Sequence, residues 1–537
     1  MKYRVYVLLN KLEMMNKNYY RLVCQLLFSA LVCPLMISAQ SKPLQVDYLI
    51  KDAWVFDGFS KDSVKTDIGI TGDKISYIGN SQKDKIKGKQ LINAKGLYLS
   101  PGFIDPHTHT EADLSAKEKE TRANLPYLFQ GVTTVVDGND GASPYPIAQK
   151  LAEWNKNGIG TNAALLVGHG TIRTKILGRN NVKPNESQLE KMKELFGQGM
   201  KDGAFGMSTG LYYAPGSYAE TDEVVALAKV VKSFNGIYDT HMRSEGTDVL
   251  KSIRETIEIG ERTGIPLHIS HLKLSGIEAW KKTEEVLELI NRTIDSGLKL
   301  NANQYPFTAS STGLSAATVP RWAEDGGRQA LLQRFKDPVL LDSIKKGINR
   351  NIKGRSGPSN IVLYIKAAPE FNGKSLTTVA KEWGKTPEDV VVSLLEQYSS
   401  PKIISHSMNE ENVQAIMKQP WVMTGSDGTS GHPRKYASFT KKIREYVLDK
   451  KIISMTRAIN NATYLTAQTF GIDKRGAIKV GYYADVILFD PQTLKDTANF
   501  DNPFEYAQGM QYVFVNGKPA IERGSYTGIL AGIALKK

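Results

Sequence analysis

Short apolar runs alternate with helical patterns along most of this 537-residue chain, and that rhythm limits the folds open to it more than any other feature. The strand-like runs are 131–137, 163–168, 204–208, 236–241, 266–270, 298–304, 402–405 and 422–426, and the helix-like stretches include 187–201, 220–234, 249–263 and 281–296. Strand, helix and strand in series indicate a parallel sheet, because parallel strands need a crossover connection. About eight such strands predict an α/β fold with a closed, TIM-like (β/α)8 barrel over residues 101–474.

Three stretches depart from this rhythm. Residues 40–100 and 475–537 carry short strand-like segments, and neither end has enough strands to bury a core alone. We therefore expect one small β-sandwich built from both termini; two separate appendages are the alternative. Between about 307 and 400, Ser- and Gly-rich segments surround helix-like ones, which predicts a subdomain inserted into the barrel.

The first 39 residues have the pattern of a signal peptide. Basic residues precede a mostly apolar run, 22–37, which is followed by Ser38 and Ala39, so we expect cleavage after Ala39 and a secreted or periplasmic protein. A membrane anchor is the alternative, but polar residues interrupt a run shorter than the ~20 apolar residues of a spanning helix. We expect no stable membrane insertion after processing. Both cysteines, Cys24 and Cys33, lie in this segment, and lipid attachment at Cys33 is a further alternative.

The net charge does not indicate a nucleic-acid partner. Because residues 1–39 carry five Lys and Arg and one Glu, the formal charge of +14 falls to +10 on processing. The remaining basic residues are scattered, and the one cluster, 83–89, is typical of a solvated loop. A nucleic-acid surface would interleave basic and aromatic side chains on one face. The sequence gives no indication of oligomeric state.

Candidate metal ligands follow the ends of separate strand-like runs. The apolar run 97–104 is expected to be one buried strand. The segment PGFIDPHTH at 101–109 then places His107 and His109 two residues apart, so an extended backbone points both to one side. Later runs are followed by Asp140, His241, His271 and Asp427. A barrel gathers such strand ends on one face, and four imidazoles with a carboxylate suit zinc or a similar ion. A second carboxylate near the metal can act as a general base.

Longer segments are specific enough to compare with known families. They are PGFIDPHTH at 101, GVTTVVDGNDG at 131, GAFGMSTGLYYAPGSYA at 203, THMRSEG at 240, ISHLK at 269, QYPF at 304, GSDGTSGHPR at 425 and GAIKVGYYADVILFDP at 476. Over residues 53–517 the chain resembles the metal-dependent amidohydrolase superfamily, and within it the N-acyl-D-amino-acid deacylase (D-aminoacylase) group. The resemblance implies a metal-bearing (β/α)8 barrel with a small β-sandwich made from both termini.

The same resemblance implies roles for particular residues. His241 and His271 match the histidines of a principal zinc ion, and His107 and His109 match those of a second, more weakly held ion. Asp427 matches the general base, which later donates the proton. The positions that hold the substrate's α-carboxylate are matched by Lys273, Arg434, Tyr305 and Tyr213. The family members best known carry a cysteine where this chain has Asp140; a carboxylate also ligates zinc but makes a harder site.

The implied activity is hydrolysis of the amide bond of an N-acyl-D-amino acid, giving a carboxylate and a free D-amino acid. The partner is then a small N-acylated amino acid or short peptide. A dipeptidase or a cyclic amidase of the same superfamily is one alternative, although a cyclic amide offers no free α-carboxylate to Lys273 and Arg434. A non-catalytic metal- or ligand-binding relative is the other, and the presence of Asp427 beside four histidines argues against it.

Overall fold

The computed structural model describes residues 44–537. The predicted signal peptide, residues 1–39, and both cysteines lie outside the described residues. Over the part that is described, no helix combines the length and apolarity needed to cross a bilayer.

Eight parallel strand positions form a central barrel. They are β6 (Phe103–Asp105), β7 (Val132–Asp137), β8 (Asn162–Leu165) continued by β9 (Val167–Gly168), β10 (Gly206–Gly210), β11 (Ile237–His241), β12 (Leu267–Ile269), β13 (Leu300–Gln304) and β17 (Val422–Thr424). Neighbouring strands pair in the orders β6-β7-β8 and β9-β10-β11-β12-β13-β17. A parallel bridge between Thr108 and Gly428, with a hydrogen bond from the Asp427 N–H to the His107 carbonyl, joins the last strand to the first. The result is the TIM-barrel-type α/β fold predicted by the alternation of strands and helices.

Helices cover the outside of the barrel. The longer ones are α5 (Ile147–Asn157), α6 (His169–Leu177), α7 (Glu186–Lys201), α8 (Thr221–Ser233), α9 (Val249–Thr263), α11 (Thr283–Asp295), α17 (Glu410–Met417), α18 (Arg434–Lys441), the π-helix η5 (Lys442–Asp449), α19 (Met455–Ala462) and α20 (Tyr464–Phe470). Single turns are α2 (Glu111–Leu114), α3 (Lys119–Arg122), α4 (Leu125–Leu128), η1 (Gly216–Tyr218) and α10 (Ile277–Trp280). In α9 the apolar residues recur at helical spacing, and Val249, Ile253 and Ile257 are buried. The strands beneath are buried on both faces, as in other helix-covered parallel sheets.

Two strand predictions were wrong in detail. The run 402–405 was expected in the barrel, but it forms β16 (Lys402–Ser405) of a separate antiparallel sheet. The run 97–104 was expected to be one strand, but it divides at Gly102 into β5 (Tyr98–Pro101) and β6, which belong to different sheets. A Cβ at Gly102 would lie 2.2 Å from the Thr133 hydroxyl, so only glycine allows the two segments to approach β7 there.

Strands from both ends of the chain share one nine-stranded sheet. They are β1 (Gln45–Val55), β2 (Val64–Thr71), β3 (Lys74–Gly79), β4 (Lys87–Asn93), β5, β18 (Val486–Phe489), β19 (Met510–Val515), β20 (Lys518–Glu522) and β21 (Ser525–Tyr526). The order is β21-β20-β19-β18-β5-β1-β2-β3, with β4 on β1. The ends meet where β18 pairs antiparallel with β5, which lies immediately before the first barrel strand.

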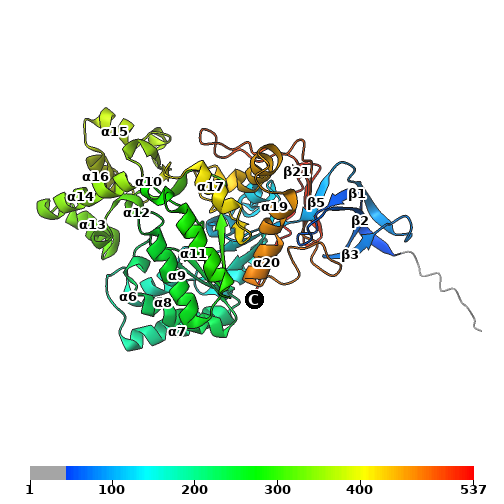
Figure 1. Ribbon diagram of the computed structural model, residues 1–537, viewed down its shortest axis with the longest axis horizontal. Helices are drawn as coiled ribbons and strands as arrows, with labels where there is room; N and C mark the ends of the chain where they lie inside the picture. Colours follow the sequence, from blue (N-terminus) through cyan, green and yellow to red (C-terminus); the bar gives the residue numbers. More distant parts are fainter. Residues whose placement is uncertain (1–43) are drawn as a thin grey trace, which may run out of the picture.

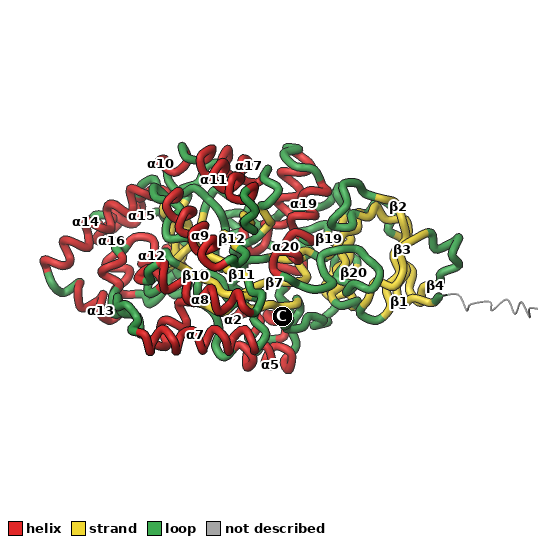
Figure 2. The backbone as a smooth tube through the Cα atoms, turned by 60° about the horizontal axis from the view of Figure 1, so that its bottom comes forward, coloured by secondary structure: helices red, strands yellow, loops and turns green. Residues whose placement is uncertain are grey.

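The stretch between β13 and β17 builds a body with its own apolar core. Its elements are β14 (Ser310–Gly313), α12 (Leu314–Thr318), η2 (Arg321–Glu324), α13 (Gly327–Arg334), α14 (Pro338–Gly354), η3 (Pro358–Asn360), β15 (Ile361–Tyr364), η4 (Pro369–Phe371), α15 (Leu376–Trp383), α16 (Pro387–Gln397) and β16. A cluster that includes Leu314, Ile344, Ile361 and Leu394 is fully buried within it. In Figures 1 and 2 this inserted body and strands β1 to β3 lie at opposite ends of the molecule, with the barrel between them.

Candidate metal centre and active site

The six predicted metal and catalytic residues meet at the carboxyl ends of the barrel strands. His107 and His109 follow β6, Asp140 follows β7, His241 ends β11, His271 follows β12 and Asp427 follows β17. Two groups of closely spaced ligand atoms result: His107, His109, Asp140 and Asp427 form one, and Asp140, His241 and His271 form the other. Asp140 belongs to both groups.

The group around Asp140, His241 and His271 has the spacing of a metal site. Asp140 Oδ1 lies 3.4 Å from His271 Nε2 and 3.6 Å from His241 Nδ1. Ligands bound tetrahedrally at about 2.1 Å are separated by roughly 3.4 Å, so these atoms can share one zinc ion.

The group around His107 and His109 is built differently. His109 Nε2 lies 3.6 Å from Asp140 Oδ2 and 3.2 Å from Asp427 Oδ1, and His107 Nε2 lies 3.5 Å from Asp140 Oδ1. Oδ1 of Asp140 therefore faces His107, His241 and His271, and Oδ2 faces His109. Both oxygens are placed to act as metal ligands.

Several of these ligand atoms are buried without a hydrogen bond among the described residues. They are both ring nitrogens of His107, Asp140 Oδ1 and His241 Nδ1. Buried polar atoms are nearly always hydrogen-bonded, and leaving one unpaired costs about 1–3 kcal/mol. Imidazole nitrogens and carboxylate oxygens are ligands that zinc accepts. The residues present therefore fit a zinc ion.

Three site residues have a left-handed backbone. The φ angles are 55° at Asp140, 36° at His271 and 48° at Asp427. This conformation costs a non-glycine residue on the order of 1–3 kcal/mol and concentrates at functional sites. Hydrogen bonds hold it in place: the His271 N–H donates to Asn303 Oδ1 at 2.9 Å, and the Asp427 N–H donates to the His107 carbonyl at 3.0 Å.

Glu245 lies behind His241 and His271, on the side away from Asp140. Its Oε1 is 3.0 Å from His271 Nδ1 and 2.5 Å from Lys273 Nζ, and its Oε2 is 3.8 Å from His241 Nε2. When Nδ1 of His271 donates its proton to Glu245, the lone pair of Nε2 faces Asp140. Arg243, two residues before Glu245 in the chain, does not pair with it and contacts Glu255 instead.

Neighbouring charges set the protonation of the cluster. Burial raises the pKa of Asp427, but Arg434 and His271 lower it further, so it lies well below its ordinary value. Burial also raises the pKa of Asp140, but the interaction with His107 outweighs this effect and holds the pKa well below its ordinary value. Burial and Lys273 lower the pKa of His271, yet the carboxylates of Glu245 and Asp427 raise it to about 9. Both aspartates are therefore ionised at neutral pH.

The four predicted substrate-binding residues surround this cluster. Arg434 Nη1 lies 2.9 Å from Asp427 Oδ2, and the Arg434 guanidinium lies 4.7 Å from the ring centroid of Tyr305. Lys273 Nζ is 5.7 Å from the same ring. Tyr213 packs its ring 4.6 Å from that of His241 and shares a 3.2 Å hydrogen bond with Thr312. A cavity of about 630 Å³, lined in part by His109, Asp140, Tyr213 and Asp427, opens beside them.

A buried hydrogen-bond network supports the site from inside the barrel. Asp239 Oδ1 lies 2.6 Å from His268 Nδ1 and accepts from Ser270 at 2.7 Å, and Asn303 lies 3.2 Å from His268 Nε2. His268 links Asp239 to Asn303, which orients the His271 backbone. The alternation of outward and inward residues along β12 was the only sequence signal for this role.

A closed α/β barrel that gathers histidines and aspartates at its carboxyl face defines a class of metal-binding barrel proteins. Comparison with known proteins identifies the family within this class. The profile described as Amidohydrolase family matches residues 90–521. The chain belongs to this family, as its motifs predicted.

The chain is similar to proteins named as D-aminoacylases and N-acyl-D-amino-acid deacylases. A D-aminoacylase of Alcaligenes xylosoxydans xylosoxydans is 31% identical over 518 residues, covering 91% of this chain and 98% of the relative. An N-acyl-D-aspartate deacylase of the same organism is 29% identical over 512 residues, covering 90% and 93%. A solved structure of N-acyl-D-glutamate deacylase from Bordetella bronchiseptica, complexed with zinc and a phosphonate inhibitor, is 26% identical with a TM-score of 0.78, covering 92% of this chain and 100% of that one.

Proposed function

We propose that this protein is a zinc-dependent hydrolase that cleaves the amide bond of N-acyl-D-amino acids, releasing a carboxylate and a free D-amino acid. The observation that carries the proposal is the position of Asp427. Its carboxylate borders the ligand cluster and is ionised at neutral pH, yet the metal group of Asp140, His241 and His271 is complete without it. The names of relatives similar over nine-tenths of the chain support the same activity.

Asp140, His241 and His271 would hold the principal zinc ion, and His107 and His109, with Asp140 as a bridge, a weaker second one. A zinc ion held there would supply Lewis-acid chemistry, polarising the scissile carbonyl and lowering the pKa of the attacking water. Asp427 accepts the proton of that water and returns it to the leaving nitrogen, which departs as the amine of the D-amino acid. Arg434 keeps Asp427 ionised before the reaction begins.

Arg434, Lys273, Tyr305 and Tyr213 would fix the substrate's α-carboxylate. Arg434 is fully buried, and its Nη1 pairs with Asp427 Oδ2 at 2.9 Å. Its Nε makes no hydrogen bond within residues 44–537, so Nε remains free to donate. Lys273 donates to Glu245 and to the His271 carbonyl, and its Nζ also lies 2.8 Å from His271 Nδ1. Its positive charge lies beside the ligand cluster, where it can attract the carboxylate. A carboxylate needs such fixed cations to offset its desolvation.

The test is metal analysis combined with amine release from N-acetyl-D- and N-acetyl-L-amino acids. We expect about one tightly bound zinc per chain and release from the D-series. The substitution Asp427→Asn should reduce kcat by about 10²–10⁴-fold with zinc content unchanged. Asp449→Asn, which removes an exposed partner of Arg444, is the control. Activity retained in Asp427→Asn would refute the mechanism, and release from cyclic amides or dipeptides alone would favour the alternative substrates.

For the chain as a whole, we propose a secreted or periplasmic protein whose signal peptide, residues 1–39, is removed. Residues 40–100 and 475–537 would then form a β-sandwich domain and residues 101–474 the barrel, with the insertion over about 307–400. The nine-stranded sheet and the separate core of the inserted body support these boundaries.

A further inference from the structure

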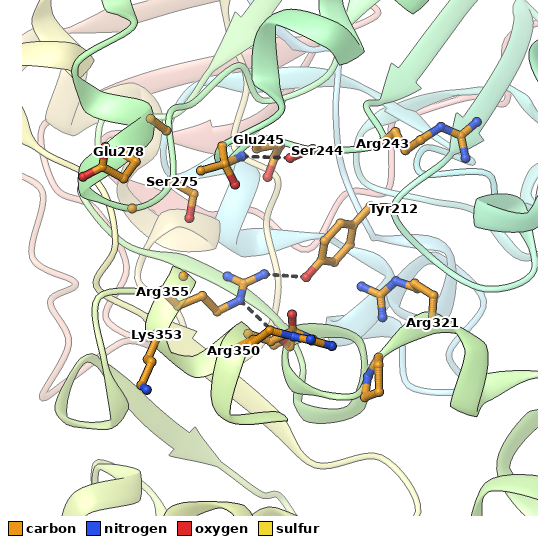
Figure 3. Close-up of a pocket in the computed structure, with 18 of the residues that line it drawn as sticks. Tyr212, Arg243, Ser244, Glu245, Ser275, Glu278, Arg321, Arg350, Lys353 and Arg355 are labelled. Carbon is orange, nitrogen blue, oxygen red and sulfur yellow. Dashed lines mark hydrogen bonds between the residues drawn. The ribbon is translucent and has the colours of Figure 1, made fainter. Parts of the chain in front are cut away.

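A second cavity, of about 890 Å³, lies between the barrel mouth and the inserted body. The barrel contributes the loops that follow β10, β11 and β12. The insertion contributes the segment between α12 and η2 and the carboxyl end of α14. Figure 3 shows that Tyr212, Arg321 and Arg355 approach one another on one side of it. We refer to it as the cationic cavity.

The cationic cavity shares a wall with the metal centre. The ring of Tyr212, which lines the cavity, stacks on that of His241 with 5.4 Å between centroids. Glu245, which also lines it, contacts His271 Nδ1 and Lys273 Nζ. Lys273, which would hold the α-carboxylate, is therefore separated from this cavity by the Glu245 side chain alone.

The charge of the lining is strongly positive. Five cations line the cavity, namely Arg243, Arg321, Arg350, Lys353 and Arg355, against two acids, Glu245 and Glu278. Both acids are already paired, with Lys273 and Lys281. Within residues 44–537, no carboxylate lies within ion-pair distance of Arg350, Lys353 or Arg355, whereas Arg243 and Arg321 pair with Glu255 and Glu324.

Arg355 is the cation best placed to receive an anion. Its Nη2 donates to the Tyr212 hydroxyl at 2.7 Å and its Nε to the Ala317 carbonyl at 3.3 Å. Those two bonds fix the guanidinium in the cavity. Among the described residues, none accepts a hydrogen bond from Nη1. Arg321 lies over the Tyr212 ring at 4.3 Å from its centroid.

We propose that the cationic cavity receives the side chain of the substrate and selects side chains that end in a carboxylate, as in N-acyl-D-aspartate and N-acyl-D-glutamate. This inference rests on the proposed function. Arg355 would pair with the carboxylate through Nη1, and Arg321 would hold Tyr212 and add to the positive field. A neutral side chain leaves Arg355 partly buried without a counter-ion, which is unfavourable.

The first experiment compares kcat/KM for N-acetyl-D-glutamate and its neutral isostere N-acetyl-D-glutamine. We expect the acidic substrate to be preferred by about 10- to 100-fold, the effect of one hydrogen-bonded charge. Equal hydrolysis of both would overturn the selectivity and leave the proposed function intact. No hydrolysis of any N-acyl-D-amino acid would overturn the proposed function itself. N-succinyl-D-leucine places the anion on the acyl group, and N-butanoyl-D-leucine is its neutral counterpart. A preference for the succinyl compound without a preference for D-glutamate would also overturn the assignment.

The second experiment locates the selectivity. Arg355→Gln should reduce the ratio of D-glutamate to D-glutamine hydrolysis about tenfold, mainly through KM for the acidic substrate. The matched control is Lys346→Gln in α14, the helix that Arg355 follows, because Lys346 is exposed and pairs with Asp342 away from the cavity. Zinc content and melting temperature are measured for both variants. If properly folded, zinc-loaded Arg355→Gln and Arg321→Gln both kept the wild-type ratio, the cavity would not be the selecting element.

Discussion

The two metal-binding groups share Asp140 but differ in what lies behind their histidines. His241 and His271 are 6% and 1% exposed, and Glu245 faces the far nitrogen of each. His109 is 32% exposed, and His107 Nδ1 is buried without a hydrogen bond among the described residues. A carboxylate behind a metal-bound histidine fixes its tautomer and raises its basicity. The comparison shows that two sites with similar ligands can differ in affinity because only one has such support.

Removing one histidine from each group should give the largest difference. We expect His271→Ala to lower zinc affinity by more than roughly 100-fold and to abolish turnover. The loss should exceed that caused by mutating a residue that only supports a ligand, because a ligand itself is removed. His109→Ala should still bind about one zinc per chain, because Asp140, His241 and His271 remain. Zinc content after dialysis against a weak chelator measures both. The comparison fails if His109→Ala loses the tight ion and His271→Ala retains it.

Neutralising Glu245 should reduce the difference in zinc affinity between the two metal-binding groups without removing a ligand. Glu245→Gln should lower zinc affinity about 10- to 100-fold, since an amide accepts a weaker hydrogen bond from His271 Nδ1. Glu278→Gln is the control, because Glu278 lines the same cavity but pairs with exposed Lys281. Chelator competition distinguishes the two variants. Equal affinity in both would mean that Glu245 does not support the tight site.

Proton competition should make zinc affinity depend on pH. In the metal-free protein the pKa of His271 is about 9, so the imidazole is protonated at neutral pH and zinc must displace that proton. The apparent affinity should therefore fall about tenfold per pH unit as the pH decreases from 9 towards 7, from this residue alone. Titration with a fluorescent zinc indicator at several pH values measures the slope. A flat profile would show that His271 is not a ligand.

Asp140 offers the smallest but most specific test. Asp140→Cys replaces a hard ligand with a soft one, so selectivity for zinc over manganese should increase. Aspartate is tolerated in the left-handed region better than cysteine, so the variant should lose about 1 kcal/mol of stability at φ 55°. Metal competition and thermal unfolding measure the two effects. Lower zinc selectivity in the variant would contradict the assignment of Asp140 as a ligand.

The sequence was most informative where a local pattern determines position. Helices α7, α8, α9 and α11 begin and end within two residues of the predicted ranges, because their apolar stripes follow the helical period. The predicted ligands meet because each follows a barrel strand, and barrel strands converge at one face. The family prediction is confirmed by the match over residues 90–521.

The sequence was least informative where position depends on how one body packs on another. The run 402–405 has the same apolar pattern as a barrel strand, and periodicity does not distinguish a parallel neighbour from an antiparallel one. Glu245 lies in a loop whose course no periodic pattern describes. Arg321 and Arg355 reach the site only because the inserted body docks beside the barrel mouth, and no motif near either residue indicates this.

The pairing of β5 with β18 has a consequence for the order in which the chain is synthesised. A ribosome releases β1 to β5 early, but β18, the second neighbour of β5, begins only at Val486, almost four hundred residues later. Until that segment emerges, β5 keeps an open edge directly ahead of the first barrel strand. All the barrel strands must therefore be translated before this edge of β5 can pair. Chains truncated before Val486 should expose a strand edge that is prone to aggregation.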